Sequence, residues 1–217
     1  DACDSAGILV LQEIPTEDNR LSQETLMNLE THPCVVGWTS AEMPTGTRDS
    51  ALDSLNKLNH QRPIVSIADG DHTNRLSRIA PLVAPNVETW KDFLDKDERD
   101  SPPPAWKLPD DYPYRDRFDD WYGTESLADT IQTAQSIQAD ILRRKIETTR
   151  IDPATTPGFI AGKLAAVWPG ISSALIDTLG RPTKGFWTVK QSCEPAILSL
   201  RRNDDRFEAW VVNSAKT

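Results

Sequence analysis

The regular alternation of short apolar runs with amphipathic helical patterns is the feature that most constrains this 217-residue chain. Runs suited to one strand each occupy residues 7–15, 35–40, 64–68 and 159–167. Helical patterns lie between them. The clearest covers residues 126–149, and another follows Asn86, which is a suitable cap. Continuous apolar strands separated by helices are typical of a parallel sheet covered on both faces. We therefore expect an α/β fold.

The pattern changes near residue 190. Strands without intervening helices are predicted at residues 186–190, 196–200 and 207–212. An all-β segment therefore follows the alternating region. Before it, residues 99–123 are rich in Pro and Asp, and so long a loop inside a domain is typical of an insertion or a functional segment.

The composition restricts the partners. A formal net charge of -9 disfavours nucleic acid and anionic membranes, because phosphates are bound by clustered Lys and Arg. No apolar run approaches the roughly 20 residues of a membrane helix, so no membrane insertion is expected. A hydrophobic content of 38% allows a packed core. Neutral ligands such as carbohydrates remain compatible with this acidic protein.

The cysteines and histidines do not predict a metal site. Cys3, Cys34 and Cys193 are odd in number and lack Cys-x-x-Cys spacing, so we expect isolated, buried thiols. The three histidines lack metal-ligand spacing. The Asp-Gly-Asp-His stretch at residues 69–72 is typical of a turn. No cofactor is expected.

Three short blocks carry a family resemblance. The first runs from Cys3 and Asp4 through Gly7 to Glu13, and the second is His32-Pro33 before an apolar strand that ends at Trp38. The third is Trp-Pro-Gly-Ile-Ser at residues 168–172, followed by Ile-Asp at 176–177 and Gly-Arg-Pro at 180–182. Together they resemble glycoside hydrolase family 2, in its β-mannosidase and exo-β-glucosaminidase branch.

This resemblance implies an architecture. Residues 1–190 would be the C-terminal portion of a (β/α)8 TIM barrel, from about strand 3 to strand 8. Residues 191–217 would begin an immunoglobulin-like β-sandwich. Six strands cannot close an eight-stranded barrel. The remainder of a longer polypeptide, or a partner chain, is therefore expected to complete it.

The resemblance also implies where catalytic groups would lie. A retaining glycosidase needs two carboxyl groups roughly 5–5.5 Å apart. The acid/base position, five residues after Trp38, holds Met43, and Glu42 precedes it. Counting back from the Glu-Thr-x-x-x-Phe-Leu helix at residues 88–94 places Arg78 at the nucleophile position. A thioether donates no proton, and a guanidinium has no lone pair for attack.

A third stretch departs from the family. Residues 162–166 stand where the family carries an aromatic residue and an Asn-Asp pair, and only Leu164 of that pattern remains. Trp38 and Trp168 are candidates for stacking on sugar faces, with core packing as the alternative.

Three readings follow. The first is a pseudoenzyme, a glycosidase-like domain without catalysis and with a structural or glycan-binding role. The second is an active retaining exo-β-glycosidase with Glu42 as acid/base, which requires a one-residue shift in register. The third is an unrelated α/β fold. The sugar and the compartment stay open.

Overall fold

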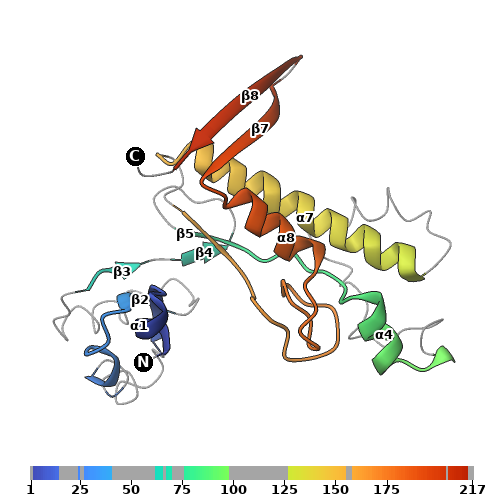
Figure 1. Cartoon of the computed structure of the whole chain (residues 1–217), viewed down its shortest axis with the longest axis horizontal. Coiled ribbons are helices and arrows are strands. Elements are labelled where there is room, and N and C mark those ends of the chain that lie inside the picture. The colour runs from blue at the N-terminus through green and yellow to red at the C-terminus, as the bar shows by residue number, and fades with distance from the viewer. Residues whose placement is uncertain are drawn as a thin grey trace, which may run out of the picture. The chain divides into compact units, whose positions relative to one another are not determined.

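The computed structural model describes residues 2–14, 24, 27–40, 62–65, 67–69, 76–97, 127–154, 158–203 and 205–214. The chain divides into two compact units, residues 1–77 and 78–217. Both strands and helices are present, as predicted for an α/β protein (Figure 1).

The first unit is built on parallel strands. It contains α1 (Ala2–Ala6), β1 (Val10–Ile14), β2 (Val35–Ser40), β3 (Ile64–Val65) and β4 (Ile67–Asp69). The order β1-β2-β3 has β2 in the centre, parallel to both neighbours. The strand predicted at 35–40 is confirmed. β1 begins later than predicted because α1 ends at Gly7, whose φ of 67° suits glycine, and residues 8 and 9 then lead into the strand.

A small core holds this sheet together. Val35 and Trp38 are buried, with Val10, Leu29 and Cys34 packed against them. Gly37 lies where the strands approach closely: a Cβ there would meet a Leu11 methyl carbon at 2.9 Å and the Pro63 carbonyl oxygen at 3.0 Å. A side chain at this position would therefore separate the strands.

The second unit is dominated by one long helix. α7 (Leu127–Ile151) confirms the helix predicted at 126–149. It contacts α4 (Val87–Phe93), β6 (Phe159–Ala161), α8 (Lys184–Ser192) and β8 (Arg206–Asn213). The predicted apolar face of α7 is buried against Trp90, Leu94 and Leu175, and its core residues are Ile131, Ala134, Ile137, Ile141 and Ile146.

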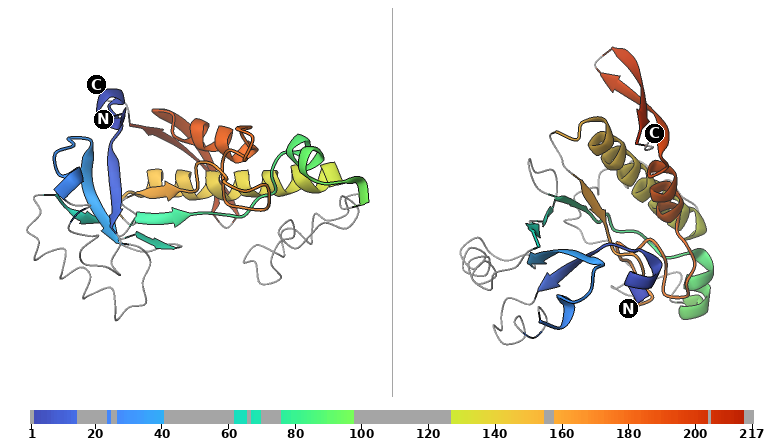
Figure 2. Two further views of the ribbon diagram at one scale, coloured as in Figure 1. Left: turned by 90° about the horizontal axis from the view of Figure 1, so that it is seen from below. Right: turned by 60° about the vertical axis from the view of Figure 1, so that its left-hand side comes forward.

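The strand predicted at residues 186–190 is wrong, because this segment is the helix α8. The run Phe-Trp-Thr-Val favours a strand by composition. However, the buried residues of α8 are Gly185, Thr188 and Ser192, which lie on one helical face. α8 lies beside α7 in all three views (Figures 1 and 2), so tertiary packing overrides local preference.

The strand predicted at 159–167 is confirmed only for β6, which neighbours β5 (Leu76–Ile79) in a sheet. Beyond it the chain pairs with a later segment: Leu175 N and Ile176 N donate to the carbonyls of Lys163 and Leu164, both at 2.9 Å. These irregular bridges position residues 163–166.

An antiparallel hairpin ends the described chain. β7 (Ala196–Asn203) pairs with β8 along its whole length, which confirms the two strands predicted there. One face turns toward α7, where Ser199 Oγ donates to Glu147 Oε2 at 2.5 Å. The opposite face leaves Leu198, Leu200 and Val211 exposed.

The described strands form small sheets and no closed barrel. The partial (β/α)8 barrel, with its boundaries 1–190 and 191–217, therefore stays a prediction. Within the described residues no helix is long and apolar enough to cross a membrane.

Candidate functional site

The predicted catalytic positions are located by sequence register. Glu42 and Met43 lie outside the described residues, directly beyond the end of β2 at Ser40. Arg78 is the third residue of the four-residue strand β5. In parallel α/β folds, active-site groups gather at the carboxyl ends of strands. In the sequence, Met43 comes after the last residue of β2, and Arg78 comes one residue before the last residue of β5.

The two candidate tryptophans have different environments. Trp38 is fully buried in the core of the first unit, at 0% exposure. The guanidinium of Arg62 lies 5.8 Å from its ring centroid and donates hydrogen bonds to the carbonyls of Leu29, Glu30 and His32. Trp168 is 68% exposed, in an irregular segment where Leu164 and Val167 are also exposed. Of the two, only Trp168 offers an accessible ring.

Asp4 connects two of the sequence blocks. Its Oδ2 lies 2.6 Å from His32 Nδ1, and its Oδ1 accepts a hydrogen bond from Cys34 N at 2.9 Å. Hydrogen bonds from the Cys34 thiol, from His32 and from the Cys34 amide hold the pKa of Asp4 well below its usual range. The carboxylate therefore fastens α1 to the loop that begins β2.

Asp177 is the centre of a second network. It is buried, and its Oδ2 accepts hydrogen bonds from Thr89 Oγ1 at 2.5 Å and Asn86 Nδ2 at 2.9 Å. Its Oδ1 accepts from the backbone amides of Leu179 and Arg181. Burial acts to raise the pKa of Asp177, but these hydrogen bonds outweigh it, so the pKa lies below its ordinary value.

Arg181 closes this network on the surface. Its Nη1 donates to Thr89 Oγ1 and its Nη2 pairs with Asp92, both at 3.1 Å. Gly180 has a φ of 78°, and the resulting turn brings the backbone of Arg181 within hydrogen-bond distance of Asp177. The turn at 177–181 is thereby fixed to α4.

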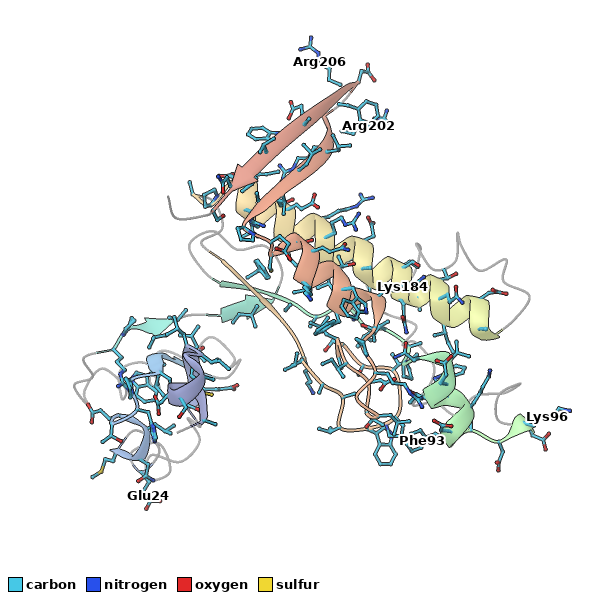
Figure 3. All side chains as sticks on the ribbon, viewed as in Figure 1. Glu24, Phe93, Lys96, Lys184, Arg202 and Arg206 are labelled. Atoms are coloured by element: carbon cyan, nitrogen blue, oxygen red, sulfur yellow. The ribbon has the colours of Figure 1, made fainter. Side chains whose placement is uncertain are left out.

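Two glutamines extend the connection to α7. Gln135 donates to Asn86 Oδ1 at 3.1 Å and accepts from Lys184 N at 3.2 Å. Gln138 is fully buried and donates to the Pro81 carbonyl at 3.3 Å. Lys184, labelled in Figure 3 at the start of α8, also donates to Ser136 Oγ at 2.9 Å. Segment 81–86, which follows β5, is therefore held by α7.

The sequence did not predict the hydrogen bonds that these side chains make. Asn86 was expected to cap α4, and it does occupy the N-cap, but its side chain makes no capping hydrogen bond and binds Asp177 instead. The sequence blocks that contain Asp177 and Arg181 indicated the family, but they did not indicate which residues these two side chains contact. Thr89 belongs to the Glu-Thr-x-x-x-Phe-Leu motif, but the sequence did not predict that it is fully buried or that it binds Asp177.

The described residues contain no cluster of three or more His, Cys, Asp or Glu side chains able to hold a metal ion. Of the three thiols, Cys3 and Cys34 are partly buried, whereas Cys193 is exposed. The expectation that all three are buried is therefore wrong: Cys193, which follows the last turn of α8, is exposed, and the other two are only partly buried.

Comparison with known proteins gives a structural answer. Neither a protein-family model nor a curated protein sequence matches the chain. Among solved structures, β-D-mannosidase from Dictyoglomus thermophilum superposes with a TM-score of 0.73 and 17% identity, over 98% of this chain and 35% of that one. The exo-chitosanase CsxA of Amycolatopsis orientalis superposes with a TM-score of 0.67 and 17% identity, over 90% of this chain and 29% of that one.

A complex of the exo-β-D-glucosaminidase CsxA with an inhibitor matches equally well, with a TM-score of 0.67 over 91% of this chain and 30% of that one. The chain thus spans about a third of the length of these proteins. At this identity the likeness concerns the fold. The chain has the fold of one segment of β-mannosidase and exo-β-glucosaminidase, so the resemblance to this branch of glycoside hydrolase family 2 is confirmed in its three-dimensional structure.

Proposed function

We propose that this chain is part of a glycoside hydrolase family 2-like domain that does not hydrolyse glycosides and that has a structural or glycan-binding role. The observation that carries the proposal is the pair of residues at the expected catalytic positions, Met43 and Arg78. Neither side chain can act as a carboxyl group.

The charge of Arg78 adds to this argument. Glycoside hydrolysis passes through an oxocarbenium-like transition state, which carries positive charge on the sugar. A carboxylate stabilises that charge, whereas a permanently protonated guanidinium opposes it. Replacement of a nucleophile by Arg thus removes the attacking group and disfavours the same transition state electrostatically.

Retained scaffold contacts support a conserved shape. Asp4 and His32 come from two of the blocks that carried the resemblance, and they contact each other at 2.6 Å. Thr89 of the α4 motif likewise contacts Asp177 and Arg181 of the last block. Substitutions fall at the expected catalytic positions, while these scaffold pairs are present.

The glycan-binding role has one accessible candidate. Trp168 has an exposed indole, and tryptophan faces stack on the apolar faces of sugar rings. The buried Trp38 serves the core of its own unit instead. A neutral carbohydrate is also compatible with the net charge of -9. The bound sugar would rest on Trp168 without being cleaved.

We also propose the domain division 1–190 and 191–217, with the second part as the start of an immunoglobulin-like β-sandwich. The hairpin β7–β8 supports this, because one of its faces is apolar and exposed. The neighbouring structures are about three times as long. Further residues of a longer polypeptide, or a partner chain, would complete the barrel and cover the hairpin.

The alternative function is an active retaining exo-β-glycosidase. It is favoured by Glu42, a carboxyl group one residue from the expected acid/base position. In this case the nucleophile would be a residue other than Arg78. The known reactions of the neighbours point to β-mannosides or β-glucosaminides as substrates.

Turnover of aryl β-mannosides and aryl β-glucosaminides separates the two functions. We expect the chain and its Glu42→Gln variant to release the phenol from these substrates no faster than buffer alone does. An active glycosidase that is expressed and purified in the same way serves as the positive control. Turnover that is abolished by Glu42→Gln would establish the alternative and refute the pseudoenzyme.

A further inference from the structure

Two of the three cysteines lie around one carboxylate. Cys3 directly precedes Asp4 in α1, and Asp4 Oδ1 accepts a hydrogen bond from the backbone amide of Cys34 at 2.9 Å. Their sequence separation gave no reason to associate them. The fold does, because α1 packs at the loop that begins β2.

Backbone hydrogen bonds tie both cysteines to the same short segment. Ile8 N donates to the Cys3 carbonyl at 3.0 Å, and Val10 N donates to the Cys34 carbonyl at 2.7 Å. Cys3 is bonded to Asp4, and Asp4 Oδ1 is hydrogen-bonded to Cys34 N at 2.9 Å. The bond lengths along this path limit the distance between the Cys3 and Cys34 Cα atoms to at most about 12 Å. A disulfide requires a separation of roughly 4.4–6.8 Å. A movement of a few ångströms therefore suffices.

The element that would have to move is α1. This helix has five residues, and none of them is buried. Its described side-chain attachment is the Asp4 carboxylate. Both cysteines are partly exposed, so a small reagent can reach them. α1 can therefore adjust without disturbing the core of Val35 and Trp38.

The surroundings of Cys34 raise the pKa of its thiol. The hydrogen bond to Asp4, then burial, then the negative charges of Asp4 and Cys3 raise the pKa of the Cys34 thiol. The raised pKa holds Cys34 as a thiol, so we assign the first attack to Cys3.

We propose that Cys3 and Cys34 form a redox-sensitive pair, which a low-molecular-weight disulfide converts into an intramolecular disulfide between α1 and the start of β2.

The exchange proceeds in two balanced steps. The Cys3 thiolate attacks one sulfur of the small disulfide, forming a Cys3 mixed disulfide and releasing one small thiol. Cys34 then loses its proton to solvent and attacks the Cys3 sulfur, forming the Cys3–Cys34 bond and releasing the second thiol. The protein loses two protons and two electrons in total, and the small disulfide takes up the same number and is reduced to two thiols.

Oxidised glutathione is the probe, applied to the full chain carrying Cys193→Ser so that the exposed third thiol does not contribute. Intact mass is measured after alkylation of the remaining thiols. We expect a species that has lost two hydrogens and carries neither glutathione nor alkyl groups, and a proteolytic fragment that joins residues 3 and 34.

One further variant and the unsubstituted chain distinguish this pair from three independent thiols. Cys34→Ser, made in the Cys193→Ser background, retains a hydroxyl able to donate to Asp4 and should stop at a Cys3–glutathione mixed disulfide. The unsubstituted chain should bind one glutathione, at Cys193. Retention of two alkylatable thiols in Cys193→Ser, or addition of glutathione to both Cys3 and Cys34, would overturn the proposal. Neither result depends on glycan binding or hydrolysis.

Discussion

Asp177 links α4 to the turn at residues 177–181 in the second unit. It receives hydrogen bonds from two side chains and two backbone amides while being buried. Removal of its charge leaves these donors poorly satisfied, so Asp177→Asn should lower the free energy of unfolding by about 2 kcal/mol. Denaturant titration checks this value. The control is Asp92→Asn, which removes an exposed ion pair with Arg181 and should cost less than about 1 kcal/mol.

The same residue predicts a pH dependence. Because the pKa of Asp177 is lowered in the folded state, its stabilisation is fully present above the unfolded value near roughly 4. It is lost as the pH falls through the lower, folded value. Stability measured from neutral pH toward acid should therefore fall less steeply in Asp177→Asn than in the unsubstituted chain. An identical slope in both proteins would contradict the network.

The two candidate tryptophans should respond oppositely to substitution. Trp38→Ala removes a fully buried ring and should cost about 3–5 kcal/mol of stability. Trp168→Ala removes an exposed ring, so stability should change by less than about 0.5 kcal/mol. Mannose and glucosamine oligomers, titrated calorimetrically, should bind the unsubstituted chain more tightly than Trp168→Ala. Equal affinity would exclude Trp168 as the sugar platform.

Among the elements, α8 shows where the local sequence pattern fails to predict secondary structure. Its residues were predicted to form a strand, yet they form a helix because Gly185 packs closely against Gln138 and Leu142 of α7. Conversely, α7 was predicted well, since 25 residues with helical spacing carry an unambiguous signal. The secondary structure of a short segment depends on tertiary contacts that the sequence alone does not reveal.

The contact at Gly185 gives a test. A Cβ there would collide with the Gln138 amide and lie 3.1 Å from a Leu142 methyl carbon. Gly185→Ala should therefore lower the free energy of unfolding by about 1–3 kcal/mol, although alanine favours helices. Lys190→Ala, at an exposed position of the same helix, should change it by less than about 0.5 kcal/mol. A stabilised Gly185→Ala variant would contradict the close packing.

Register from Trp38 and from the α4 motif predicts Met43 and Arg78 at the catalytic positions, and these two assignments stay predictions. The residues that hold the surrounding segments, Asn86 and Thr89, contact Asp177 about 90 positions away. Such long-range polar contacts leave no periodic trace in a single sequence. The family blocks indicated Asp177 without its partners.

In the whole molecule, the fold is that of a segment of these glycosidases, whereas the loss of their chemistry is our proposal. The superposition covers nearly all of this chain, while the chain covers about a third of each enzyme. A fold can persist when its reaction is lost, because scaffold contacts and catalytic groups are different residues. The exposed apolar face of the hairpin indicates where additional structure would attach.

The central claim is the absence of a catalytic carboxyl pair. An experimental structure of the chain, completed by its remaining polypeptide or partner, would measure the distances between carboxyl groups beyond β2 and at the end of β5. We predict that Met43 and Arg78 occupy the facing positions and that no two carboxyl groups lie across the site. A pair that includes Glu42 and faces another carboxylate at roughly 5–5.5 Å would contradict the account.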